Sequence, residues 1–154
     1  MKDLLKKIII CLLPSILSSI VIMLNYNYID IYKNLDKPKL SLSIFIILIV
    51  WCVLYIVIGI SLYRICLSDN NKDSYCFYYI IQLLLSYLGM FLFFSFRLYG
   101  LTFIVTIVSM VFVLITTIKS FKIDRISGII MIIYSLWYMY NIYIVCFIWM
   151  RNEM

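Results

Sequence analysis

The sequence predicts an all-α protein, an integral membrane bundle of five transmembrane helices. Of its 154 residues, 66% are hydrophobic and only 13% are charged, against about 25% charged residues in a typical soluble domain. The charged residues separate long uncharged runs, and each run approaches or exceeds the roughly 20 residues that a helix needs to cross a bilayer. A water-soluble core would need polar residues to cover it, and the chain has too few.

The first two runs each follow basic residues. The first comes after three lysines in residues 1–7 and is expected to span at about residues 8–29, with a bend near Pro14. It is longer than the roughly 7–15-residue apolar core of a signal peptide. The second run, at residues 40–63, follows the basic turn Lys37-Pro38-Lys39 and contains no charge.

Charged residues also delimit the three later runs. The third span is expected at residues 74–96, between a polar turn and Arg97. The fourth is expected at 100–118 and the fifth at 126–150, joined by a short basic connection. Because the connections after the second, third and fourth runs are too short for further domains, residues 1–154 are expected to form one five-helix domain.

Composition argues against several functions. The formal charge of +6 does not indicate nucleic-acid binding, because the basic residues are scattered between apolar runs, where topology signals and contacts with membrane lipid belong. The chain has no histidine, the commonest general base and transition-metal ligand, so neither a metal nor a bound cofactor is expected. The five cysteines include no C-x-x-C pair and are interpreted as small buried hydrophobic residues.

The distribution of basic residues predicts the orientation in the membrane. An odd number of spans puts the two termini on opposite sides. Of the 13 Lys and Arg residues, eight then fall on the N-terminal side and five on the other. The positive-inside rule therefore favours a cytoplasmic N-terminus.

Three of the predicted spans carry polar or aromatic side chains at helical spacing, and polar groups in a span usually face other helices or a cavity. These side chains are Trp51, Tyr55 and Gly59 in the second span, Gln82, Ser86, Gly89 and Phe93 in the third, and Tyr134, Trp137, Asn141 and Ile148 in the fifth. Trp51 and Trp137 lie deep in their spans, where an indole N–H needs a partner. We expect the faces to line a pocket; the alternative is that the amides join helices and the rings only pack.

The motifs on these spans resemble those of the translocator protein/tryptophan-rich sensory protein family, also called peripheral-type benzodiazepine receptors. The family's V-W-x-x-L-Y-x-x-x-G-x-S block corresponds to residues 50–61, its third-span Q-L-x-L-N-x-x-W-x-x-x-F-F pattern to residues 82–94, and its P-Y-x-x-W pattern to residues 133–137. The resemblance covers roughly residues 5–152. The chain departs from the family at Leu40, Leu42 and Ser43 in the first loop and at Ser86, Gly89, Ile133 and Asn141 in the spans.

The resemblance implies a bacterial membrane protein that binds a tetrapyrrole such as protoporphyrin IX between its helices and acts as a sensor, regulator or transporter. The residues expected to bind the ligand are Trp51, Tyr55, Gly59, Gln82, Ser86, Phe93, Tyr134, Trp137 and Asn141. A flat apolar macrocycle can lie against indole and phenol rings. Its carboxylates need cations, for which the candidates are Lys33, Lys37, Lys39 and Arg97. The resemblance also implies a homodimer, with Ser15/Ser19 or Ser86/Gly89 as candidate contacts.

Two other functions stay open at this point. Some bacterial relatives are associated with light- and oxygen-dependent porphyrin breakdown, in which residues matching Trp51 and Trp137 are catalytic. Oxidation of an indole is reasonable chemistry for a site without histidine or metal. The other alternative is a structural or lipid-binding protein on the same scaffold, which the altered first loop favours.

Overall fold

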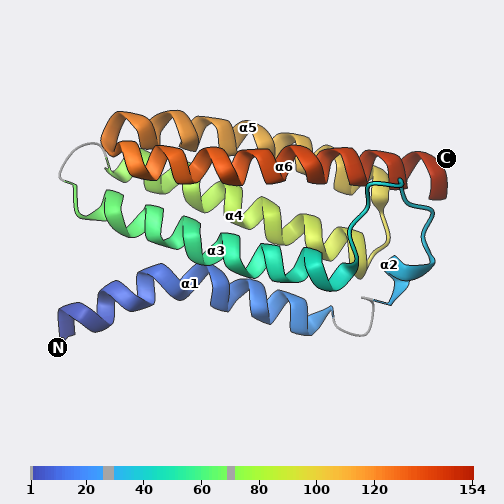
Figure 1. The fold of residues 1–154 in the computed structure, drawn as a ribbon, viewed down its shortest axis with the longest axis horizontal. Coiled ribbons are helices and arrows are strands. Elements are labelled where there is room, and N and C mark those ends of the chain that lie inside the picture. The colour runs from blue at the N-terminus through green and yellow to red at the C-terminus, as the bar shows by residue number, and fades with distance from the viewer. Residues whose placement is uncertain (1, 26–29, 69–71) are drawn as a thin grey trace.

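The computed structural model describes residues 2–25, 30–68 and 72–154, all of which are helical or irregular. The helices in these ranges are α1 (Lys2–Leu24), α2 (Ile31–Asn34), α3 (Ile44–Cys66), α4 (Lys72–Phe94), α5 (Tyr99–Ile123) and α6 (Arg125–Asn152). All but the short α2 run side by side along the molecule, with α2 and the C-terminus at one end and the N-terminus at the other (Figure 1). The all-helical class predicted from the sequence is confirmed.

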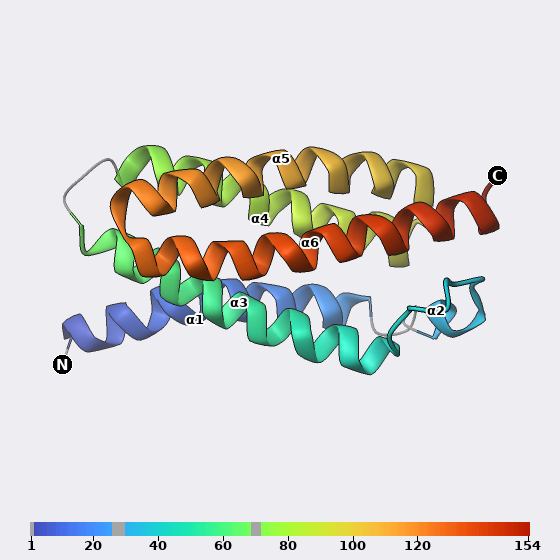
Figure 2. The same ribbon diagram turned by 45° about the horizontal axis from the view of Figure 1, so that its top comes forward.

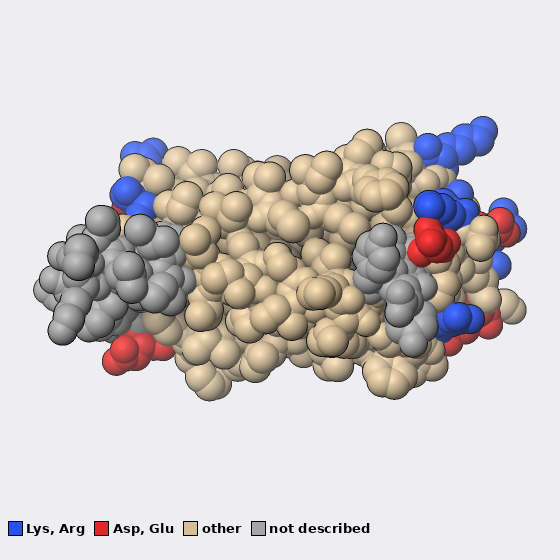
Figure 3. Space-filling model, turned by 90° about the horizontal axis from the view of Figure 1, so that it is seen from below, with Lys and Arg blue, Asp and Glu red and all other residues tan. Residues whose placement is uncertain are grey.

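The described helices include four, α3 to α6, that are long and apolar enough to cross a membrane. In α1 the apolar stretch found among the described residues is the shorter Leu12–Leu24, and residues 26–29 of the predicted first span lie outside the described residues. On the face shown in Figure 3, charged side chains gather at the two ends and leave an uncharged middle. The chain is therefore an integral, multi-pass membrane protein, and the fifth span remains a prediction for α1.

Side-chain and backbone caps determine where the helices begin and end. Ser43 accepts a hydrogen bond from the Ile46 N–H, so α3 begins at Ile44 rather than at the start of its uncharged run. At the end of α4, the Leu98 N–H donates to the Leu92 carbonyl and so satisfies one of the carbonyls of the last turn. Arg97, just before Leu98, has a left-handed backbone conformation with a φ of 57°, where glycine is usual because it has no Cβ.

The helices pack in a fixed pattern of neighbours. α5 lies between α4 and α6, and α3 packs against both α1 and α6, as Figures 1 and 2 together show. α1 is joined to α4 by the Tyr87 hydroxyl, which donates to the Pro14 carbonyl at 2.8 Å, and by a 2.6 Å bond from Ser95 to Asn25. In an apolar surrounding such bonds join helices because no water competes for the polar groups.

A stripe of hydroxyl side chains follows the buried face of α5. It consists of Thr102, Thr106, Ser109, Thr116, Thr117 and Ser120. Most of these hydroxyls donate to carbonyls one turn earlier in α5, and Thr116 donates to Oε1 of Gln82 on α4 at 2.6 Å. The stripe gives the interior of the bundle polar contacts in which these hydroxyls find acceptors within the protein.

An ion pair closes the end of the bundle opposite α2. The Arg64 guanidinium donates two hydrogen bonds to the Asp124 carboxylate, at 2.8 and 2.9 Å, and thereby joins α3 to the α5–α6 connection. Asp124 also accepts the Ser127 backbone N–H at 2.8 Å and so caps α6. The Arg64 guanidinium, with help from the Ser127 hydrogen bonds, holds the pKa of Asp124 well below its usual range.

Candidate functional site

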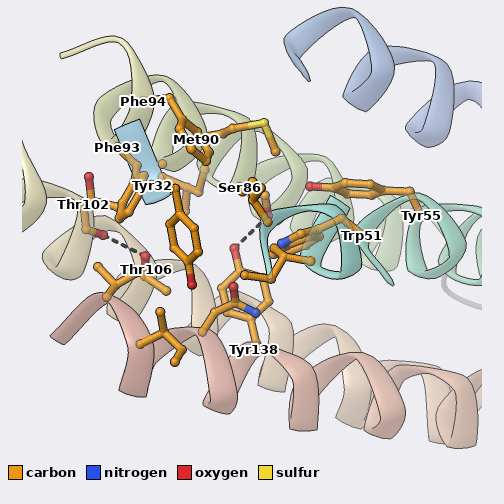
Figure 4. Close-up of a pocket in the computed structure, with 17 residues that line it drawn as sticks. Tyr32, Trp51, Tyr55, Ser86, Met90, Phe93, Phe94, Thr102, Thr106 and Tyr138 are labelled. Carbon is orange, nitrogen blue, oxygen red and sulfur yellow. Dashed lines mark hydrogen bonds between the residues drawn. The ribbon is translucent and has the colours of Figure 1, made fainter. Parts of the chain in front are cut away.

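A cavity of about 100 Å³ lies between α3, α4, α5 and α6, near the end of the bundle that carries α2. The described residues that line it are mostly apolar and aromatic, and none of them is charged. The largest lining side chains are Tyr32, Trp51, Tyr55, Phe93, Phe94 and Tyr138, and Figure 4 shows them arranged around the space. Sites for drug-sized molecules usually measure roughly 300–1,000 Å³, so this cavity is too small for a drug-sized molecule as it stands.

Trp51 forms an aromatic wall on the α3 side of the cavity. Its ring stacks on Tyr55, one turn later, with centroids 5.3 Å apart and planes 26° apart. It meets three rings of α6 edge-on, those of Tyr138 at 5.9 Å, Tyr134 at 6.2 Å and Trp137 at 6.4 Å. Each offset or edge-to-face ring pair of this kind contributes about 0.5–1.5 kcal/mol of stability in addition to the effect of burying the rings. The indole is therefore held in a defined position at the cavity wall.

The inner wall of the cavity is a small hydrogen-bond network. The Ser86 hydroxyl of α4 and the Ser109 hydroxyl of α5 each lie 2.8 Å from the hydroxyl of Tyr138 on α6. Ser86 also donates to the Gln82 carbonyl at 2.7 Å. The network joins three helices at this depth, and it brings hydroxyl groups to an otherwise apolar cavity.

The segment of residues 30–43, here called the covering loop, closes the open end of the cavity. Its Tyr32 is only 4% exposed and reaches into the cavity beside Phe93, with ring centroids 6.4 Å apart (Figure 4). Burial raises the pKa of Tyr32 to about 12, and Tyr140 adds to the shift, so the phenol is neutral at physiological pH.

Two side chains of α6 hold the covering loop in place. Asn152 accepts the Asp36 N–H at 3.0 Å and donates to the Asp36 carbonyl at 3.1 Å. The Tyr140 hydroxyl accepts the Leu42 N–H and donates to the Leu40 carbonyl, both at 3.1 Å. The loop is thus fastened at two points, and access to the cavity from this end requires at least part of it to move.

Comparison with known families agrees with the motifs and the helical membrane fold. A model of the TspO/MBR family matches residues 8–150, nearly the whole chain. The chain belongs to the TspO/MBR family. A comparison with curated protein sequences gave no match.

The ligand-binding residues predicted for this TspO/MBR protein divide into two groups. Trp51, Tyr55, Ser86, Phe93 and Asn141 line the cavity. Gly59, Gln82, Tyr134 and Trp137 do not line it but lie buried or half-buried among the helices. Two members of this second group contact residues that line the cavity: Trp137 touches Trp51 edge-on, and the Tyr134 hydroxyl lies 3.4 Å from the Ser86 hydroxyl.

The four predicted carboxylate-binding cations are in different situations. Lys33 pairs with Asp30, with Nζ and Oδ1 2.6 Å apart. The Lys37 ammonium donates to three backbone carbonyls of the covering loop, at 2.7, 3.0 and 2.8 Å, so it stabilises the loop. Lys39 and Arg97 are exposed, and the described structure shows no ion pair for either. Of the four, these two have charges free to meet an anionic group.

The cavity also has lining residues that the sequence interpretation missed. They include Tyr32, Met90, Thr102, Thr106 and Tyr138. A signal existed for three of them: Thr102 and Thr106 begin the hydroxyl stripe of α5, and Tyr138 follows Tyr134 by one turn. No local pattern marked Tyr32, because its place depends on how the covering loop folds back. Among the described residues no group of His, Cys, Asp and Glu is arranged to hold a metal ion.

Proposed function

We propose that this TspO/MBR protein binds a tetrapyrrole such as protoporphyrin IX in the cavity beside Trp51 and acts as a sensor, regulator or transporter for it. The observation that carries the proposal is the stacked pair of Trp51 and Tyr55 on the wall of an uncharged, mostly apolar cavity. A flat conjugated macrocycle gains most from such a wall, because ring faces offer large apolar contact with a preferred geometry.

The cavity has to widen before it can take a macrocycle. At about 100 Å³ it is smaller than the 150 Å³ cavity that is known to hold a benzene. The covering loop offers the route, since withdrawing Tyr32 would open the cavity at the end near Phe93. In the proposed complex the macrocycle takes the space that Tyr32 fills and lies against Trp51.

The carboxylates of such a ligand would remain at the mouth of the cavity. The part of the interior that the structure describes has no charged lining residue, and an ionised carboxylate without a cation is costly to bury. Lys39 and Arg97 form no ion pair within the described ranges, whereas Lys33 and Lys37 are already engaged. The proposal therefore assigns the carboxylates to Lys39 and Arg97.

A titration with protoporphyrin IX tests the proposal directly. Protein in nanodiscs is titrated with protoporphyrin IX, and the dissociation constants of wild type, Trp51→Phe and the double variant Trp51→Phe/Trp137→Phe are compared by porphyrin absorbance. We expect Trp51→Phe to weaken binding roughly tenfold through lost ring contact. Wild-type affinity in the double variant, or no saturable binding in wild type, would refute the pocket assignment.

A second candidate function is porphyrin breakdown that depends on light and oxygen. The contact between Trp51 and Trp137, 6.4 Å between centroids, favours it, because an oxidised Trp51 would have a second indole in contact. The Trp137 N–H is also buried, with no hydrogen-bond partner in the described part of the chain. Bound porphyrin is illuminated in air and its absorbance followed; a spectrum that stays unchanged relative to porphyrin in empty nanodiscs rules this function out.

A further inference from the structure

The Tyr55 hydroxyl stands out among the groups that line the cavity. Tyr55 is 0% exposed, and its hydroxyl oxygen is buried with no hydrogen-bond partner among the residues that the structure describes. Figure 4 shows the hydroxyl directed toward Ser86, while the ring lies beside Trp51. Leaving a buried hydroxyl unpaired destabilises a fold, so an unpaired one on a cavity wall points to a missing partner.

Counting protons shows why Ser86 does not serve as that partner. A serine hydroxyl has one proton and two lone pairs. Ser86 gives its proton to the Gln82 carbonyl at 2.7 Å, since a carbonyl can only accept. The 2.8 Å contact with Tyr138 then requires Tyr138 to donate, which fills the first lone pair of Ser86.

Two buried phenols compete for the second lone pair. The Tyr134 hydroxyl lies 3.4 Å from Ser86 and holds that position, while Tyr55 remains without a bond. The rest of the network is consistent with this assignment, because Ser109 can donate to Tyr138 at 2.8 Å once the Tyr138 proton points to Ser86. One phenol proton is left without an acceptor, that of Tyr55, which lines the cavity, whereas Tyr134 does not.

We propose that Tyr55 donates this proton to a neutral hydrogen-bond acceptor of the ligand, such as a carbonyl oxygen or an unprotonated ring nitrogen. A carboxylate fits this inner position poorly, because the described lining of the cavity offers no cation to offset its desolvation. The ligand is therefore bound with a neutral acceptor inward and any charged group toward the covering loop. This inference rests on the proposed function, since it describes how the same cavity selects its ligand.

A matched pair of probes tests the inference. Fluorenone and fluorene are flat aromatic molecules that differ by one carbonyl group. Each is equilibrated with nanodiscs that contain wild type, Tyr55→Phe or Tyr87→Phe, and binding is corrected for empty nanodiscs. Tyr87→Phe is the control, because it removes a phenol hydroxyl next to Tyr55 (ring centroids 5.5 Å apart) that already donates to the Pro14 carbonyl.

We expect wild type and Tyr87→Phe to prefer the ketone roughly fivefold and Tyr55→Phe to show no preference. The infrared carbonyl band of bound fluorenone should lie at lower wavenumber in wild type than in Tyr55→Phe, since a hydrogen bond weakens the C=O bond. Ligand-free Tyr55→Phe should melt at the same or a higher temperature than wild type, because it loses an unpaired buried hydroxyl.

The outcomes separate this inference from the proposed function. Equal affinities and identical carbonyl bands in wild type and Tyr55→Phe would overturn the inference and leave cavity binding intact. A Tyr55→Phe protein that is less stable than wild type, or fails to fold, would show that the hydroxyl has a partner in the protein and would also overturn it. If neither probe binds saturably to wild type, both the inference and the aromatic-binding function fail.

Discussion

Replacing Asn152 with alanine should speed ligand binding by loosening the covering loop. The Asn152 side chain makes two hydrogen bonds to the Asp36 backbone, at 3.0 and 3.1 Å, and both are solvent-exposed. A hydrogen bond contributes about 0.5–1.5 kcal/mol net, and exposed ones fall at the low end. Losing both should cost the closed loop about 1 kcal/mol, which raises the open population about fivefold.

Stopped-flow mixing of protoporphyrin IX with nanodisc-embedded protein measures this effect through tryptophan quenching. The association rate of Asn152→Ala should rise about fivefold if binding follows loop opening. The dissociation rate should rise as well, because the ligand leaves by the same route. Asn34→Ala is the control, since Asn34 is exposed on α2 and the described structure shows no hydrogen bond from its side chain.

An unchanged association rate would refute this reasoning. The variant must first melt within a few degrees of wild type, so that the comparison is between folded proteins. If Asn152→Ala is folded and binds no faster than wild type, then the covering loop does not limit access to the cavity. A similar acceleration in Asn34→Ala would show that any change in this segment has the effect, and that the two bonds to Asp36 are not its cause.

Three further predictions concern stability, each measured by thermal unfolding in detergent. Gly100→Ala should lower stability by about 1–3 kcal/mol, because the new Cβ would lie 2.6 Å from Nε1 of Trp149; Trp149→Ala in the same chain should remove that clash. Asp124 should contribute stability that is fully present above its ordinary pKa of 3.8 and is lost as the pH falls toward its depressed folded value; Asp124→Asn, which leaves Arg64 without its ion pair, should abolish that acid dependence. Gln82→Leu should be neutral or stabilising by about 1 kcal/mol, because the buried Nε2 of Gln82 has no hydrogen-bond partner among the described residues; a loss of more than 2 kcal/mol would contradict this.

Helical spacing in the sequence was enough to predict part of the cavity wall. Trp51 and Tyr55 are one turn apart, and both line the cavity, as do Ser86 and Phe93 on α4. On α6 the predicted face was built on Trp137, whereas the neighbouring Tyr138 lines the cavity. Adjacent helical residues point about 100° apart, so a small error in the rotation of α6 exchanges one aromatic ring for the other. Whether any of these residues binds a ligand remains a prediction.

The sequence by itself determined that this is a helical membrane protein of the TspO/MBR type. Because long uncharged runs lie in the bilayer, their backbone has no water to form hydrogen bonds with, and a helix satisfies the backbone polar groups within each segment. Rotation and contact between helices depend instead on packing along their whole length, which no local pattern contains. Only the tertiary structure could therefore place Tyr32 in the cavity and show which of the proposed cations are already engaged. It alone shows that the Tyr55 hydroxyl has no hydrogen-bond partner among the residues described.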